Sequence, residues 1–144
     1  MNTKVYPNKM RLKKKIFLSG PIRGVSRKDS LAWREKAEGY LTEKFEVIHA
    51  LRGREVKETF ADPRAAVIRD INDIKEADIL LVSDTGQNCS MIGTSMEVFF
   101  AFQQNKPVIA FGSAHKNDYW LNYCTHLRVE TLEEACAVLN KMFA

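Results

Sequence analysis

Residues 79–82 read Ile79-Leu80-Leu81-Val82 and form the most continuous apolar run in the chain. A strand that is apolar at every position, rather than at alternate ones, is typical of a sheet covered on both faces. Other short apolar runs lie at 15–18, 45–48 and 107–111. The sequence therefore predicts a buried sheet whose central strand is residues 79–82.

Amphipathic stretches separate these runs, and several carry helix start signals. Asp29 or Ser30 can cap the first stretch, Asp62-Pro63 opens the second, and Thr131 with Glu134 forms a capping box for the last. The expected helices cover residues 29–41, 62–74, 94–104 and 131–142, with Leu31, Trp33, Ala37, Tyr40, Leu41, Val98, Phe99, Ala101 and Phe102 pointing inward.

Strands that alternate with helices indicate a parallel sheet with helices on both faces. A short fifth strand is predicted at 127–129, and the polar segment 52–60 is interpreted as a loop. We therefore expect one α/β domain over residues 15–144, preceded by a basic tail at 1–14.

The composition favours an ordinary soluble globular protein. The chain has 144 residues, of which 45% are hydrophobic and 28% charged. The net charge of +4 suggests a polyanion partner, but residues 1–15 hold six basic residues and no acidic one. The rest carries 16 basic against 18 acidic residues, so we expect no polynucleotide partner.

No apolar stretch approaches the roughly 20 residues that a membrane helix needs, and none resembles a signal peptide. We therefore expect no membrane partner and a cytoplasmic location. Cys89, Cys124 and Cys136 are far apart and form no CxxC pair. Together with three scattered histidines they predict reduced cysteines, no metal site and no cofactor.

Ligands of parallel sheets bind beyond the carboxyl ends of the strands, where loops meet helix N-termini. This rule selects segments 19–24, 83–95 and 112–123, all rich in Gly, Ser, Thr or Asn. In the first segment, glycines let backbone N–H groups approach an anion, and Arg23 can bind phosphate oxygens. A tight turn with a solvated arginine explains the same residues equally well.

Residues 93–97 form the sharper candidate, because Gly93-Thr94-Ser95 is expected at a helix entry and Glu97 in its first turn. An ionised carboxylate at a cleft can act as a nucleophile, whereas a capping glutamate would only bond back to the helix start. Asp70, near the middle of its helix, can point toward the first loop and pair with Glu97. Alternatively, Asp70, Asp73 and Asp78 are surface acids that pair with Arg69 and Lys75, and Asp73 is expected to face solvent.

The segments Ser19-Gly20-Pro21-Ile22-Arg23-Gly24 and Gly93-Thr94-Ser95-Met96-Glu97 resemble the nucleoside 2-deoxyribosyltransferase family. That family includes the 2'-deoxynucleoside 5'-phosphate N-hydrolases and the CMP N-glycosidases, and the resemblance covers nearly the whole chain. It implies a Rossmann-like, flavodoxin-type sheet and a homodimer or larger assembly that acts on a small-molecule nucleoside or nucleotide.

The resemblance also implies roles for individual residues. Glu97 matches the nucleophile that attacks C1' of the sugar, and Asp70 matches its orienting partner. Phe17 matches an aromatic position that is tyrosine in many members, but it has no hydroxyl, so its role reduces to packing. The remaining substrate-binding positions that the resemblance implies are Ser19, Gly20, Ile22, Arg23, Gly24, Ser90, Gly93, Thr94 and Ser95, with Asn122 as the candidate contributed to a neighbouring subunit.

Overall fold

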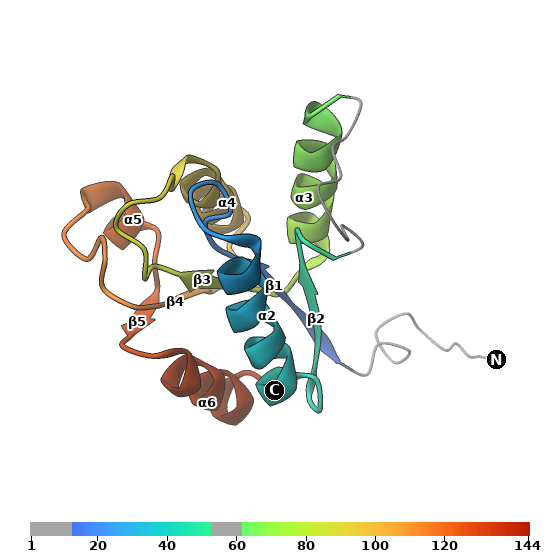
Figure 1. Ribbon diagram of the computed structural model, residues 1–144. Coiled ribbons are helices and arrows are strands. Elements are labelled where there is room, and N and C mark those ends of the chain that lie inside the picture. The colour runs from blue at the N-terminus through green and yellow to red at the C-terminus, as the bar shows by residue number, and fades with distance from the viewer. Residues whose placement is uncertain (1–12, 53–61) are drawn as a thin grey trace.

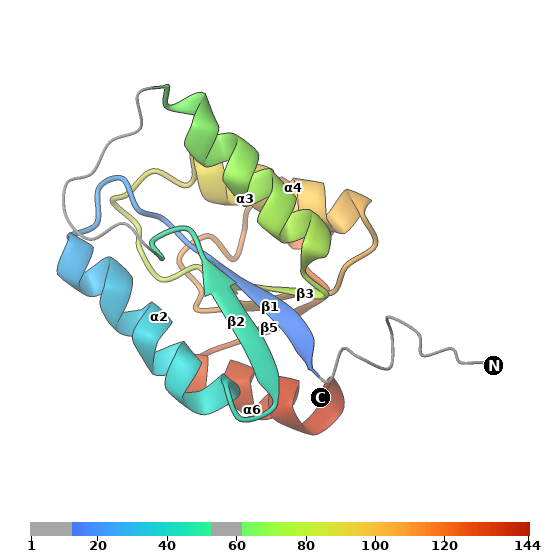
Figure 2. The same cartoon turned by 90° about the vertical axis from the view of Figure 1, so that its right-hand side faces the viewer.

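The computed structural model describes residues 13–52 and 62–144 and shows three layers, with a sheet between two groups of helices (Figures 1 and 2). Of the segment predicted as a loop at 52–60, all but Arg52 lies outside the described residues, as does most of the basic tail. The strands are β1 (Lys14–Ser19), β2 (Phe45–His49), β3 (Ile79–Ser83), β4 (Val108–Phe111) and β5 (Leu127–Val129). The helices are α2 (Arg27–Leu41), α3 (Arg64–Glu76), α4 (Ile92–Gln103), α5 (Tyr119–Tyr123) and α6 (Leu132–Met142).

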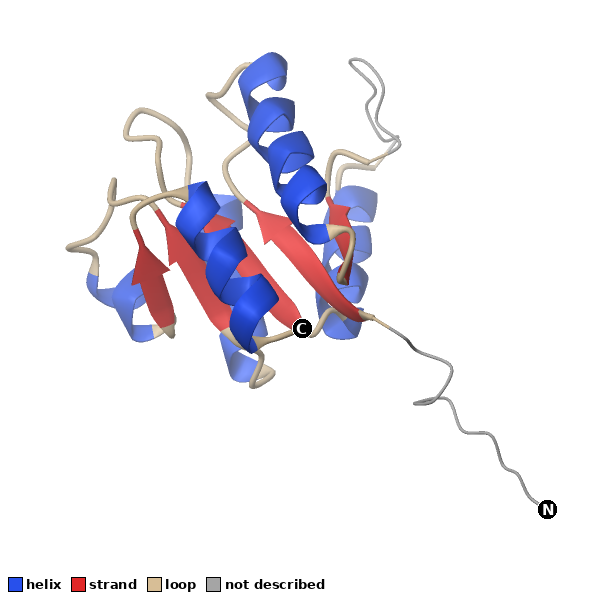
Figure 3. Cartoon of the chain, turned by 90° about the horizontal axis from the view of Figure 1, so that it is seen from below, coloured by secondary structure: helices blue, strands red, loops and turns tan. Residues whose placement is uncertain are grey.

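All strand pairs of the described sheet are parallel, in the order β2-β1-β3-β4-β5 (Figure 3). This is the flavodoxin-type order, and the predicted α/β class is therefore confirmed. The order reverses direction between β1 and β3, which pair with Leu18 opposite Leu81. The carboxyl ends of these two strands form the topological switch point, where ligands of such sheets bind.

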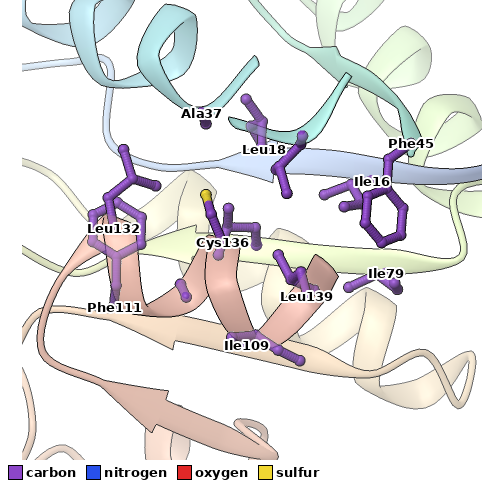
Figure 4. Packing of buried hydrophobic residues seen from close by; sticks show 13 residues of the cluster. Ile16, Leu18, Ala37, Phe45, Ile79, Ile109, Phe111, Leu132, Cys136 and Leu139 are labelled. Carbon is purple, nitrogen blue, oxygen red and sulfur yellow. The ribbon is translucent and has the colours of Figure 1, made fainter. Parts of the chain in front are cut away.

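Alternate strand residues feed two separate apolar layers. Ile16, Leu18, Leu81 and Ile109 pack against α2 and α6 on one face (Figure 4). On the other face, strand residues that include Phe17 pack with α3, α4 and α5. The strands are thus buried on both sides, as the continuous apolar runs predict.

Two helix starts differ from the sequence-based expectation. Helix α2 begins at Arg27, because the Ser26 side chain accepts a hydrogen bond from the Asp29 N–H at 3.1 Å. Helix α4 begins at Ile92 without a side-chain cap, two residues before the predicted start. Glu97 therefore lies in the second turn of α4, not in the first, and is not a capping residue.

The other helix ends follow the predicted chemistry more closely. The capping box of Thr131 and Glu134 is present at α6. Helix α3 begins at Arg64, whose N–H donates to the Asp62 carboxylate at 3.0 Å. The single-turn helix α5 was not predicted; it is capped by Asp118, which accepts from the Leu121 N–H at 2.8 Å.

Two inward-facing predictions are wrong. Tyr40 is 43% exposed, and Phe99 is 40% exposed on the outer side of α4. Arg34, which was not among the residues of α2 expected to point inward, is buried and only 1% exposed. None of the helices in the described part of the chain is long and apolar enough to cross a membrane.

Candidate active site

A cleft of about 570 Å³ opens at the switch point, beside the end of β1. We call it the switch-point cleft. The loop after β1, the start of α4 and the middle of α3 form its walls, and its floor includes the buried Arg34. Its lining comprises Leu18, Gly20, Pro21, Ile22, Arg23, Arg34, Ala50, Val67, Asp70, Ser90, Ile92, Gly93, Thr94 and Glu97.

Glu97 is fixed by a short hydrogen bond from β1. The Ser19 hydroxyl, at the carboxyl end of the strand, donates to Glu97 Oε1 at 2.6 Å. Ser19 is itself buried, whereas Glu97 is partly exposed to the cleft. A single donor on one oxygen orients the carboxylate and leaves Oε2 for a ligand.

The surroundings of Glu97 favour its neutral form. Burial is the largest effect and raises the pKa of Glu97 to about 7; the Ser19 hydrogen bond and the charge of Arg34 oppose this rise, while Asp70 adds to it. A carboxyl of this kind changes protonation state near neutral pH. Perturbed acids of this sort in clefts are typical of functional sites.

A second cavity adjoins the first and is almost entirely apolar. It measures about 650 Å³ and lies over α3, α4 and α5; we call it the α4 groove. Met96, Phe99 and Trp120 line it, and the rings of Phe99 and Trp120 meet edge to face at 6.2 Å. Asp70 and Glu97 line both cavities, so the acidic pair lies at their junction.

Known proteins resemble this chain in fold rather than in sequence. No protein-family model and no curated protein matches the sequence. Among solved structures, the 2-deoxyribosyltransferase of Bacillus psychrosaccharolyticus superposes with a TM-score of 0.67 at 22% identity, over 83% of this chain and 88% of that one. The CMP N-glycosidase of Clostridium botulinum gives a TM-score of 0.60 at 20% identity, over 89% of this chain and 98% of that one.

The chain has the 2-deoxyribosyltransferase fold. This confirms the fold that the sequence resemblance implies. The molybdenum cofactor binding protein of Rippkaea orientalis also shares it, with a TM-score of 0.60 at 15% identity over 92% of this chain and 97% of that one. A fold that serves enzymes and a binding protein does not determine function, so the site residues must carry the functional argument.

The 2-deoxyribosyltransferase fold brings most of the expected site residues together. Glu97, Asp70, Gly20, Ile22, Arg23, Ser90, Gly93 and Thr94 all line the switch-point cleft. Gly24 lies behind it with a φ of 87°, and a Cβ there would meet the Cys89 backbone at 3.1 Å. This close approach, with the Ser90 N–H donating to the Arg23 carbonyl at 3.2 Å, joins the two loops that border the cleft.

Three expected positions lie elsewhere. Phe17 is fully buried in the layer beneath α3 and α4, which leaves it only the packing role. Ser95 lines the α4 groove rather than the switch-point cleft. The Asn122 side chain donates to the Lys116 carbonyl at 2.6 Å and accepts from Arg128 at 3.4 Å, so its amide is engaged within its own chain.

Asp73 and Asp78 do not form the surface pairs considered from the sequence. The expectation that Asp73 faces solvent is wrong, because its carboxylate forms a two-pronged ion pair with Arg52, at 2.5 and 3.0 Å. Asp78 lies between α3 and β3, and it accepts a hydrogen bond from the Lys15 N–H of β1 at 2.8 Å. Arg69 donates to the Ala50 carbonyl at 2.6 Å.

A buried polar network at the end of β3 was not predicted from the sequence. Asp84, which follows β3, is fully buried and accepts hydrogen bonds from the His115 N–H, the His115 ring and Arg128, at 3.0, 2.7 and 2.8 Å. These bonds hold the loop after β4 against the end of β3. Within residues 13–52 and 62–144, no cluster of three or more His, Cys, Asp or Glu side chains is arranged to hold a metal ion.

Because the pKa of Glu97 is raised in the folded chain, we predict that the free energy of unfolding depends on pH. Between its ordinary pKa of 4.5 and about 7, the folded chain holds a proton that the unfolded chain has lost, so stability falls as pH rises through this window. Glu97→Gln removes this dependence. We expect the free energy of unfolding of the variant, relative to wild type, to increase by about 1–3 kcal/mol from about pH 5 to about pH 8.

Urea denaturation at the two pH values measures this difference. Glu43→Gln, an exposed position in the turn after α2, is the matched control and should show no such change. If the difference in the free energy of unfolding between Glu97→Gln and the wild type is the same at both pH values, the raised pKa of Glu97 is contradicted.

Proposed function

We propose that this chain cleaves or transfers at the N-glycosidic bond of a (deoxy)nucleoside or its 5'-monophosphate. The observation that carries the proposal is the Glu97 carboxylate, held by Ser19 at 2.6 Å at the junction of a polar cleft and an apolar groove. A sugar at this junction would place its anomeric carbon beside the carboxylate. The shared fold with a 2-deoxyribosyltransferase and a CMP N-glycosidase supports the same chemistry.

In the proposed reaction, the ionised Glu97 carboxylate attacks C1' of the sugar and forms a glycosyl ester. The bond from C1' to the base nitrogen breaks, and its electron pair leaves with the base, which takes up a proton. A second base or a water molecule then displaces Glu97 from C1', so two inversions give net retention. Asp70 lines the same cleft and is proposed to orient Glu97 and assist protonation of the base.

A 5'-phosphate would bind at the loop after β1. Arg23 is exposed at the switch-point cleft, and Ser90 and Thr94 line the same cleft. An arginine fork and hydroxyl donors are the groups that bind phosphate oxygens. Ser19, which the sequence resemblance groups with this loop, instead gives its hydroxyl to Glu97 and is proposed to orient it.

A second copy of the chain is proposed to cover the α4 groove. Val67, Met96, Phe99 and Trp120 line this groove and are 55%, 69%, 40% and 74% exposed, an apolar face of the kind that forms interfaces. Because Asp70 and Glu97 also line the groove, a partner on this face would close the site against water. Exclusion of water favours transfer of the sugar to a base over hydrolysis.

Two other functions of the same site are alternatives to a transferase. With water as the acceptor, the same residues make a deoxynucleoside 5'-monophosphate N-glycosidase. A non-catalytic nucleotide-sensing domain would bind at the same loops without releasing base, and the shared fold with a molybdenum cofactor binding protein favours this second alternative over an unrelated function. Incubation with nucleosides and 5'-monophosphates, with and without a free acceptor base, followed by chromatography separates the three.

Glu97→Ala removes the proposed nucleophile, so we expect base release from deoxynucleotides to fall by about 1,000-fold or more. The fold should persist, because the side chain lies at a cleft and not in either apolar layer. Chromatography of released base measures the rate, with Glu43→Ala as the control. Wild-type rates in a folded Glu97→Ala variant would exclude the nucleophile.

Arg23→Ala tests the phosphate site. We expect kcat/KM for 5'-monophosphates to fall about 10- to 100-fold, because one charge-assisted pair is lost, and kcat/KM for free nucleosides to change little. Lys44→Ala, which removes an exposed positive charge in the turn before β2, is the matched control. Equal losses for nucleosides and nucleotides would remove Arg23 from phosphate binding.

Sedimentation velocity tests the proposed assembly. We expect a species of twice 16.5 kDa or larger, which Trp120→Glu converts to the 16.5 kDa monomer because it places a charge in the apolar face. Tyr40→Glu, on the opposite helical layer, is the control at another exposed aromatic residue. A wild-type chain that sediments as a monomer at all concentrations contradicts the proposal.

A further inference from the structure

Arg34 is the largest fully buried side chain among the described residues, and it is charged. It lies beneath the switch-point cleft. Its guanidinium stacks over the neighbouring Trp33 ring, 4.7 Å from the centroid. Burying a charge is costly unless the group is paired or hydrogen-bonded. The buried position of Arg34 therefore depends on the hydrogen bonds that its guanidinium makes.

The guanidinium holds the loop that follows β1. One nitrogen donates to the Gly20 carbonyl at 2.9 Å, and the other donates to the Ser30 carbonyl and hydroxyl at 2.9 and 2.8 Å. Gly20 directly follows Ser19, the donor to Glu97. A continuous chain of contacts therefore runs from α2 through the loop to the Glu97 carboxylate.

Arg34 forms no contact ion pair with another described residue. Among the described residues, no carboxylate lies within 4.0 Å of its guanidinium, and its Nε–H is buried without a hydrogen-bond acceptor. The acids that act on it electrostatically are Glu97 and Asp70. Burial lowers the pKa of Arg34 to about 10, so the group is still charged at neutral pH.

We propose that Arg34 is a positioning residue that fixes the Ser19–Gly20 segment and supplies an internal positive charge that favours the ionised carboxylate of Glu97. This inference deepens the proposed function, because an ionised Glu97 is the form that attacks C1'. Arg34 bonds to Gly20 and Ser30 behind the loop, and its proposed action on Glu97 runs through the Ser19–Gly20 segment and through its charge. Arg23, at the rim, keeps the separate role of binding anions.

The groups that face Glu97 define what the removal of Arg34 does. Ser19 faces it from β1, Asp70 from α3 and Arg34 from α2, while Arg23 lines the same cleft from the loop. Without Arg34, the nearby acid and burial act against ionisation with less opposition. The pKa of Glu97 should then rise further above its ordinary range.

The test is a titration that needs no substrate. The carboxyl carbon of Glu97, labelled with ¹³C and assigned by its loss in Glu97→Gln, is followed by NMR over pH in the wild type and in Arg34→Met, Arg34→Gln and Arg34→Lys. We expect the two neutral variants to titrate about one pH unit or more above the wild type, and Arg34→Lys to stay near it. Lys28→Met removes an exposed positive charge from the same helix and should leave the midpoint unchanged.

A folded neutral variant with the wild-type midpoint overturns the proposal. Activity gives a second readout: Arg34→Lys keeps the charge but not the fork, so we expect kcat to fall about tenfold with KM little changed. If neither neutral variant folds, wild-type kcat in Arg34→Lys shows that the guanidinium fork is not needed and overturns the positioning of the Ser19–Gly20 segment by Arg34. A chain without any activity on N-glycosidic bonds would refute the proposed function, while the NMR titration would still decide the role of Arg34.

Discussion

The hydrogen bond from the Ser19 hydroxyl to Glu97 joins the end of β1 to the second turn of α4, and the geometry of the switch-point cleft depends on it. A half-buried carboxyl needs a donor, because removal from water penalises its charged form. Ser19 can supply that donor only at the last position of the strand, where the sheet ends and the side chain reaches the cleft. The register of β1 against β3 therefore sets the position of the acid.

That register is itself fixed by burial on both faces. A shift of β1 by one residue would exchange Phe17 with Ile16 and Leu18 between the two apolar layers, and would turn Ser19 away from α4. Such a shift would place each of these side chains in a layer packed around a side chain of another size, and misfits of this kind cost roughly 1–3 kcal/mol each. The apolar core thus stabilises a polar arrangement that is unfavourable on its own, in which Asp70 and Glu97 line one cleft.

The sheet could be predicted from the sequence because its strands are continuous apolar runs, and the rule for parallel sheets located the ligand edge. Residues of that edge, such as Glu97 and Arg23, then followed. Arg34 could not be found in this way, because hydrophobic periodicity assumes that the buried positions of a helix are apolar. It therefore counted Tyr40 as inward and left out Arg34. In fact the buried side of α2 is Ser30, Arg34, Ala37 and Leu41, at helical spacing but half polar.

The start of α4 and its inner face were missed for a related reason. Gly93-Thr94-Ser95 has the composition of a helix entry, yet the helix begins earlier, at Ile92. The helix is apolar around most of its circumference, because Val98 and Ala101 face the sheet while Phe99 faces the α4 groove. Periodicity cannot separate the two faces of such a helix, so Phe99 was expected inside.

Ser19, and not Phe17, supplies the hydroxyl that β1 donates to Glu97. The resemblance to nucleoside 2-deoxyribosyltransferases leaves Phe17 without the hydroxyl of the family's common tyrosine. Phe17 and Ser19 lie two residues apart on one strand, so both side chains point to the same face of the sheet. Phe17 packs under α3 and α4, and Ser19, one pleat nearer the edge, donates the hydrogen bond to Glu97. Ser19 thus gives Glu97, from the same face of β1, the hydroxyl donor that Phe17 lacks.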